Sequence, residues 1–218
     1  MAQYGTKHGH ARGKFEALKR NPEVELVGIF EPDMRRRKEL TETDSLYRDV
    51  LWFDDKNDML QDSSIVAIAS EGRNDESLDQ TEEIVKAGKH VWYDKPAGDD
   101  WDRWKRLVAL AKESGCIIQM GYMFRYHLGF QLIDEWVKSE VLGDVFAVRA
   151  NMSTWVGEES RKIISRHPGG IFYDLAGHML DQVVWILGRP LKVQSSFRND
   201  TGIVPQFKDN TLAVFEYE

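Results

Sequence analysis

The chain has 218 residues, of which 42% are apolar, so it is long enough for one large domain or two small ones with a real core. Its 36 acidic residues outnumber its 29 basic ones, and the net charge of −7 argues against nucleic acid or an anionic membrane as the main partner. A single cysteine, Cys116, excludes an internal disulfide and a cysteine-based metal site. Because neither a membrane-length apolar run nor a signal-peptide pattern is present, we expect a soluble cytoplasmic protein.

The first half of the chain alternates between apolar runs and helical patterns, which predicts a parallel sheet covered by helices on both faces. Such sheets bind ligands at the carboxyl ends of their strands, where this sequence carries Glu31, Ser70-Glu71, Asp94-Lys95-Pro96 and Gly121-Tyr122. The expected strands are 24–30, 50–55, 63–70, 89–96 and 116–124, and the expected helices are 8–20, 35–43, 56–62, 75–88 and 99–115.

After about residue 127 the pattern changes, which predicts a second domain consisting of a mixed or antiparallel sheet with helices on one side. The expected elements are helices at 130–143 and 169–190 and strands at 144–155, 191–200 and 210–218. We therefore expect an α/β chain with one domain over 1–122 and an α+β domain over 123–218.

Within the expected helix 169–190, polar residues interrupt an apolar pattern. Asp174, His178, Asp181 and Trp185 follow one another at helical spacing and would share one stripe. Two interpretations stay open from the pattern alone: a solvent-facing polar stripe, or a functional group in which a carboxylate orients an imidazole.

Three segments in this order, "GKHVWYDKPAG" (88–98), "GYMFRYHLGF" (121–130) and "GGIFYDLAGHMLDQVVWILGRP" (169–190), resemble the glucose–fructose oxidoreductase / inositol dehydrogenase / rhizopine-catabolism (Gfo/Idh/MocA) family. The resemblance implies an N-terminal Rossmann domain that binds NAD or NADP and a C-terminal open sheet that contacts a sugar, polyol or related substrate. It also implies that Lys95, Asp174 and His178 serve the chemistry.

These residue types suit oxidation of an alcohol. A histidine can accept the hydroxyl proton, since its ordinary pKa is near neutral. Lys95 would supply positive charge where an alkoxide develops, and Asp174 would bind a substrate hydroxyl or hold the imidazolium. Asp181 is expected to be structural.

The family's glycine-rich turn aligns with "YGTKHGHARG" (4–13), in which Gly5 fits the first glycine, whereas Lys7 and His10 stand where the second and third are usual. Glu31, about 20 residues further on, favours NAD by holding ribose hydroxyls, whereas Arg35 or Arg36 would favour NADP. No metal is expected at His8 and His10, because no further ligands lie nearby in the sequence. The expected cofactor-binding residues are Gly5, Lys7, His8, His10, Glu31, Ser70, Asp94, Lys95 and Arg125.

Two other functions stay open: NAD-dependent cleavage of glycosides, and nucleotide binding without catalysis. Family members are longer, and this chain has a short first strand and stops within a strand, so we expect an incomplete second sheet and low activity. An exposed sheet edge predicts self-association as a dimer or larger homo-oligomer.

Overall fold

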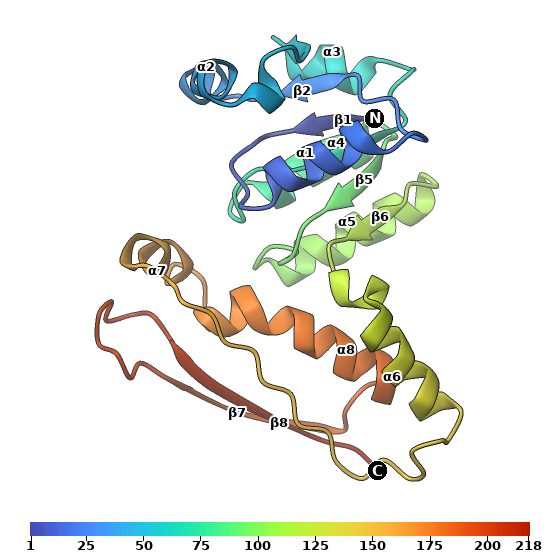
Figure 1. Ribbon diagram of the computed structural model, residues 1–218, viewed down its shortest axis with the longest axis vertical. Coiled ribbons are helices and arrows are strands. Elements are labelled where there is room, and N and C mark those ends of the chain that lie inside the picture. The colour runs from blue at the N-terminus through green and yellow to red at the C-terminus, as the bar shows by residue number, and fades with distance from the viewer. The chain divides into compact units, whose positions relative to one another are not determined.

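The computed structural model describes residues 1–218, which divide into two compact units, Met1–Gly121 and Tyr122–Glu218 (Figure 1). The N-terminal unit is built on six strands in the order β3-β2-β1-β4-β5-β6, and every neighbouring pair is parallel, as predicted. The chain leaves β1 toward one edge and later crosses to the other, which is the doubly wound Rossmann topology. The strands are β1 (Ala2–Tyr4), β2 (Gly28–Phe30), β3 (Trp52–Phe53), β4 (Ala67–Ser70), β5 (His90–Tyr93) and β6 (Ile118–Met120).

The central strand β1 has only three residues, yet each of them pairs on both sides. Ala2, Gln3 and Tyr4 align with β2 on one side and with β4 on the other, and all three are buried. The short strand thus lies fully inside the sheet.

Apolar clusters on the two sheet faces explain why both are covered. Ile29 packs with Phe15 and Tyr47, whereas the next residue, Phe30, packs against the larger cluster around Ile68 and Ile84. Successive strand residues point to opposite faces, so the two clusters mark the two faces. The helical segments of this unit are α1 (Ala11–Arg20), α2 (Met34–Thr43), η1 (Ser45–Tyr47), α3 (Lys56–Gln61), α4 (Ser77–Lys86) and α5 (Trp101–Glu113).

The C-terminal unit combines helices with one antiparallel hairpin. Helix α6 and the segment η2 pack against α8, and Phe124 of η2 stacks on Phe130 of α6 with ring centroids 4.5 Å apart. The elements are η2 (Met123–Tyr126), α6 (Leu128–Lys138), α7 (Glu158–Ile164), the π-helical segment η3 (Phe172–Ala176), α8 (Gly177–Leu187), β7 (Lys192–Arg198) and β8 (Asn210–Glu216).

The loop between β7 and β8 fixes the start of the helical stretch that carries Asp174. Ile171 donates its amide hydrogen to the carbonyl of Lys208 at 2.9 Å. Gly170 has a φ of +54°, and a Cβ there would meet the Lys208 backbone nitrogen at 2.7 Å. Asp209 holds the loop itself, because it accepts hydrogen bonds from the amides of Asp200 and Thr201 and pairs with Arg161 at 3.2 Å.

The prediction of a strand over 144–155 is wrong. This segment has no ladder with β7 or β8, and the second sheet contains these two strands alone. Its alternating pattern predicts an extended chain, but a strand also needs a hydrogen-bonded neighbour, which the pattern does not supply. Helix α7 was not predicted, whereas β7 and β8 were. Cys116 packs partly buried against the large cluster and lies two residues before β6.

Candidate functional site

A tight turn follows β1 at the carboxyl edge of the sheet, and Gly5 makes it possible. Gly5 has a φ of +83°, and a Cβ at this position would lie 2.9 Å from the backbone nitrogen of Gly72. Its amide donates to the carbonyl of Phe30 at 2.7 Å. Since only glycine tolerates both the conformation and the close approach, the first position of the glycine-rich turn has its expected structural role.

Lys7 stands where a second glycine would allow backbone to approach a ligand. Its ammonium lies 3.6 Å from Asp33 and 3.8 Å from Glu76, and its side chain is mostly buried. At this position the turn therefore has a lysine ammonium paired with two carboxylates, where a glycine would leave the backbone uncovered.

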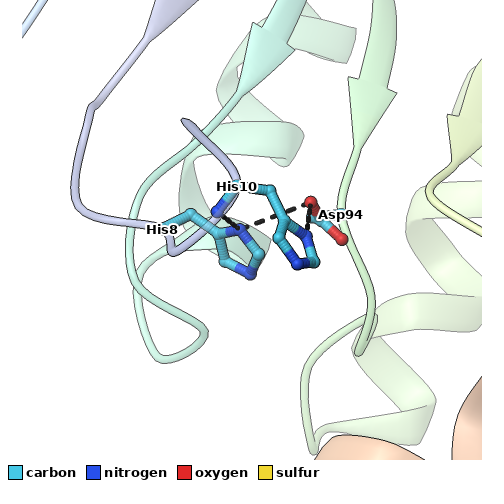
Figure 2. Close-up of side chains that lie close together, drawn as sticks. All are labelled: His8, His10 and Asp94. Carbon is cyan, nitrogen blue, oxygen red and sulfur yellow. Dashed lines mark hydrogen bonds and ion pairs between the residues drawn. The ribbon is translucent and has the colours of Figure 1, made fainter. Parts of the chain in front are cut away.

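His8 and His10 converge on Asp94, which follows β5 (Figure 2). The Nδ1 atom of His10 lies 2.9 Å from Asp94 Oδ2, and that of His8 lies 3.3 Å from the same oxygen. His8 Nδ1 also accepts a hydrogen bond from the His10 amide at 3.1 Å. Asp94 is in turn oriented by the amide of Lys95, which donates to Oδ1 at 2.8 Å.

Lys14 and Glu71 complete this buried charged cluster. Lys14, on the first turns of α1, places its ammonium 2.5 Å from Glu71 Oε1 and 3.2 Å from Asp94 Oδ2. The backbone carbonyl of Glu71 accepts a hydrogen bond from the His8 amide at 3.0 Å. We use "the His8 cluster" below for His8, His10, Lys14, Glu71 and Asp94.

Burial and charge act in opposite directions on these groups. Burial lowers the pKa of His8 to about 4 and raises that of Glu71 to about 7. Burial alone would raise the pKa of Asp94, but the hydrogen bond to His10 and the charge of Lys14 hold it below its usual value. The hydrogen bond to Asp94 raises the pKa of His10. His8 is therefore a neutral imidazole at neutral pH, and Asp94 is a carboxylate.

Glu31 lies at the end of β2, but its side chain is only 2% exposed. Thr6 donates to its Oε2 at 2.6 Å, and the amide of Asp33 donates to its Oε1 at 3.0 Å. Arg36 donates in turn to the hydroxyl and the carbonyl of Thr6, at 2.7 and 2.6 Å. The acid is therefore part of a Thr6–Arg36 network that holds the turn.

Two other expected residues of the N-terminal unit are also buried. Ser70, at the end of β4, donates to the carbonyl of Ser77 at 3.4 Å and accepts from Thr81 at 3.1 Å. Lys95, the second residue after β5, is 7% exposed. A lysine at a strand end could simply be a surface residue, but lysines are rarely buried unless their ammonium has partners, so a plain surface position does not fit Lys95.

In the C-terminal unit, the polar stripe is only partly α-helical. Asp174 lies in the π-helical segment η3, and His178 is the second residue of α8, 4% exposed and 5.4 Å from the ring of Phe124. π-Helical turns occur frequently at functional sites. The expectation of one continuous α stripe is wrong at Asp174, and a solvent-facing stripe does not fit a buried His178.

Arg125 is bound within the C-terminal unit. Its guanidinium donates to both oxygens of Asp181, at 2.8 and 2.5 Å, and lies 4.9 Å from the ring centre of Trp185. Asp181 thus orients Arg125. This fork-like pairing fixes Arg125 on the side of α8 that carries Trp185.

Lys14 and Thr6 belong to this site but were not predicted from the sequence. Glu71 was noted only for its place at a strand end, and Arg36 only as a residue that would favour NADP. Lys14 comes four residues after His10, at the start of a helix, and Glu71 directly follows β4, so both had a positional signal. Their partners come from other strand ends and are distant in sequence, which is why no local pattern joins them.

Family models match almost the whole chain. Residues 4–122 match the oxidoreductase family with an NAD-binding Rossmann fold, and residues 130–218 match the GFO/IDH/MocA C-terminal domain. The chain belongs to the Gfo/Idh/MocA oxidoreductase family. Its N-terminal unit is therefore the family's NAD-binding domain, as the sequence resemblance implied.

Individual relatives are distant. The chain is 30% identical over 125 residues to dTDP-3,4-didehydro-2,6-dideoxy-alpha-D-glucose 3-reductase of Streptomyces violaceoruber, which covers 56% of this chain and 36% of that protein. It is 24% identical over 173 residues to D-glucoside 3-dehydrogenase of Escherichia coli, covering 77% and 48%. A crystal structure of a probable dehydrogenase from Thermotoga maritima has a TM-score of 0.81 at 20% identity, covering 98% of this chain and 64% of that one.

The chain thus spans about half the length or less of the curated relatives it matches, and somewhat under two thirds of the solved structure. Every helix in the structure is too short or too polar to cross a bilayer.

Proposed function

We propose that this chain is the nucleotide-binding and catalytic part of an NAD(P)-dependent oxidoreductase that acts on a hydroxyl or carbonyl group of a sugar or polyol. The observation that carries the proposal is the Gly5 turn at the carboxyl end of the central strand of a doubly wound sheet, in a unit that matches the family's NAD-binding domain. Ligands of such sheets bind where the strand order reverses, which is at this turn.

The proposed catalytic residues are Lys95, Asp174 and His178. A bound nicotinamide would accept or supply the hydride. In the oxidation direction, the carbon–hydrogen bond of the alcohol breaks with loss of hydride, and the hydroxyl proton passes to the His178 imidazole. Lys95 stabilises the negative charge that develops on the oxygen, and Asp174 binds a neighbouring hydroxyl or holds the imidazolium.

The substrate class rests on the named activities of relatives. Two of them act on a dTDP-linked sugar and on a D-glucoside, and both names specify position 3 of the ring. We propose a carbohydrate-like substrate for this chain on that basis. NAD-dependent cleavage of a glycoside remains the alternative within the same chemistry, and it would give no net NADH.

The test of the catalytic proposal compares two buried polar residues of α8. His178→Ala is expected to lower turnover on an active sugar or polyol by about 10²–10⁴-fold, because that is the usual contribution of a general base. Gln182→Ala is the matched control, since Gln182 is also buried one turn further along the helix. Equal turnover in the two variants, both folded by circular dichroism, would remove His178 from the mechanism.

Cofactor preference is tested separately by thermal shift with NAD, NADH, NADP and NADPH. We propose a preference for NAD, because the buried carboxylate of Glu31 and the nearby Asp33 put negative charge at the end of β2, where a 2′-phosphate would be repelled. A clearly larger stabilisation by NADP would contradict this and point to Arg35 or Arg36 as phosphate ligands.

The second candidate function is nucleotide binding without catalysis. The composition of the turn that follows β1 favours this candidate. Lys7 puts a bulky side chain where the second glycine usually lets backbone approach the pyrophosphate, and His10 replaces the third glycine. Stabilisation by a dinucleotide, together with no turnover on a sugar and polyol panel, would support this candidate over the first.

We also propose that the chain self-associates through its hairpin. Val193, Leu212 and Val214 are exposed apolar side chains on two strands that have no further neighbours in their sheet. Exposed edges of this kind pair readily with other chains. Light scattering is expected to give a dimer or larger species, and a monomer at micromolar concentration would contradict it.

A further inference from the structure

We propose that His8, His10 and Asp94 form a binding site for a divalent transition-metal ion, of which Zn²⁺ fits best. Two imidazoles and one carboxylate are a donor set that suits Zn²⁺, Co²⁺ and Ni²⁺ much better than Mg²⁺ or Ca²⁺. The three side chains offer one donor atom each, and these atoms all lie within 4.8 Å of one another. Sequence analysis did not favour a metal here because Asp94 is 84 residues from His10.

The spacing of the donor atoms fits a single ion. Metal–ligand bonds of about 2.0–2.2 Å in a tetrahedral zinc site place neighbouring donor atoms roughly 3.3–3.5 Å apart. His8 Nδ1 is 3.3 Å from Asp94 Oδ2, and His10 Nδ1 is 2.9 Å from the same oxygen. Small side-chain rotations would therefore bring the three groups to coordination distance, with the ion replacing the hydrogen bond that the His10 amide donates to His8.

Glu71 provides the independent indication that a ligand belongs here. Its side chain is 0% exposed, and its Oε2 atom has no hydrogen bond although it is fully buried. A buried carboxylate oxygen without a hydrogen bond is costly, so it needs an explanation. Oε2 lies 3.7 Å from His8 Nδ1. From there it can serve as the fourth ligand of the ion or orient the His8 ring.

The cluster is open to solvent on the side of His10. The His10 side chain is 56% exposed, which leaves a path from solvent to the otherwise buried His8 and Asp94.

Lys14 is the one group that opposes a cation. Its ammonium lies 3.2 Å from Asp94 Oδ2 but closer, at 2.5 Å, to Glu71 Oε1. It can therefore stay on Glu71 while Asp94 turns to the ion, so that Lys14 and Glu71 support the ligands from outside.

The test is titration of the chelator-treated full chain with ZnCl₂ by isothermal calorimetry, and with CoCl₂ by visible absorption. We expect one saturable ion per chain and the d–d bands of low-symmetry Co²⁺. His10→Ala, whose side chain is half exposed, should keep the fold and lower Zn²⁺ affinity by at least the ~10–100-fold that loss of an outer partner costs. Asp94→Asn should do the same.

His127→Asn is the matched control, because it removes an exposed imidazole from the other unit while asparagine can still cap α6. Its Zn²⁺ affinity should equal that of the unmodified chain. Absence of saturable binding, or equal affinities of folded His10→Ala and unmodified chains, would show that the three residues form a hydrogen-bonded cluster only. No nucleotide is present in this titration, so its outcome is independent of the proposed oxidoreductase function.

Discussion

The two sheets of this protein differ in a way that strand length does not predict. Strand β1 has three residues, all buried, because it has neighbours on both sides and helices over both faces. Strand β7 has seven residues, all exposed, because it has one neighbour in its sheet and only partial cover, as where Phe197 packs on Phe172. Burial of a strand in this chain therefore follows from the number of its neighbours and from the packing over its faces, and not from its length.

The largest expected difference between the two sheets is in the free energy of unfolding that is lost when one apolar side chain of each sheet is truncated. Ile68→Ala, next to β1 in the parallel sheet, should lower the free energy of unfolding of the N-terminal unit by about 2–5 kcal/mol, since it leaves a cavity. Val193→Ala in the hairpin should stay within about 0.5 kcal/mol. Urea unfolding followed by circular dichroism measures both, and similar losses would break the comparison.

The turn after β1 should be nearly as sensitive as the core. Gly5→Ala forces a side chain into a positive φ and against the Gly72 backbone, so we expect a loss of about 1–3 kcal/mol and no thermal shift with NAD(H). Gly9→Ala in the same turn is the control, because a Cβ there meets nothing within 4 Å. If Gly5→Ala kept its stability and nucleotide response, the turn would be far more adaptable than its geometry indicates.

A smaller effect is expected from acid pH on the hairpin loop. Burial alone would raise the pKa of Asp209, but hydrogen bonds from Thr201 and Asp200 and the charge of Arg161 hold it below the ordinary value of 3.8. The folded state thus binds the proton less tightly than the unfolded state. The stabilisation is complete above pH 3.8 and is lost as pH falls through the lower folded pKa. Amide protection of the 199–209 loop, taken as the exchange rate relative to the intrinsic rate, should fall over this range, and Asp209→Asn should lower this protection already at neutral pH.

The smallest effect concerns the ion pair that joins the open ends of β7 and β8. Lys192 lies 3.1 Å from Glu216, but both side chains are more than half exposed, and exposed pairs contribute about 0–1 kcal/mol. Lys192→Ala should therefore leave the melting temperature almost unchanged at any salt concentration. A marked, salt-sensitive loss would mean that this end of the hairpin is far less hydrated than its exposure indicates.

Strands β2 to β6 of the parallel sheet were predictable because each follows from a local apolar run within an alternation of strands and helices, whereas β1 was expected only as a short first strand. The hairpin strands 192–198 and 210–216 were predictable from alternation or β-rich composition. The segment 144–155 failed because a strand depends on a partner, which no local pattern encodes. Among the site residues, Gly5 could be assigned from its turn, whereas the meeting of His8, His10 and Asp94 could not, because the fold joins strand ends that lie far apart in the sequence.

Glu31 shows the same limit at a single position. Its place at a strand end was correct, but the sequence did not reveal that Thr6 and Asp33 would use both of its oxygens. The π-helical segment at Phe172–Ala176 was equally invisible, because apolar spacing over so few residues fits an α-helix as well.

That π-helical segment also affects how this part of the chain can tolerate changes in length. An α-helix rotates about 100° per residue, and a π turn, closed by i→i+5 hydrogen bonds, accommodates one residue more. Deleting a single residue between Asp174 and His178 can therefore be absorbed by conversion to regular α-helix, without breaking the element. The same deletion would change the rotational phase of Asp174 relative to His178, so a folded protein with its two polar groups out of alignment is the expected product.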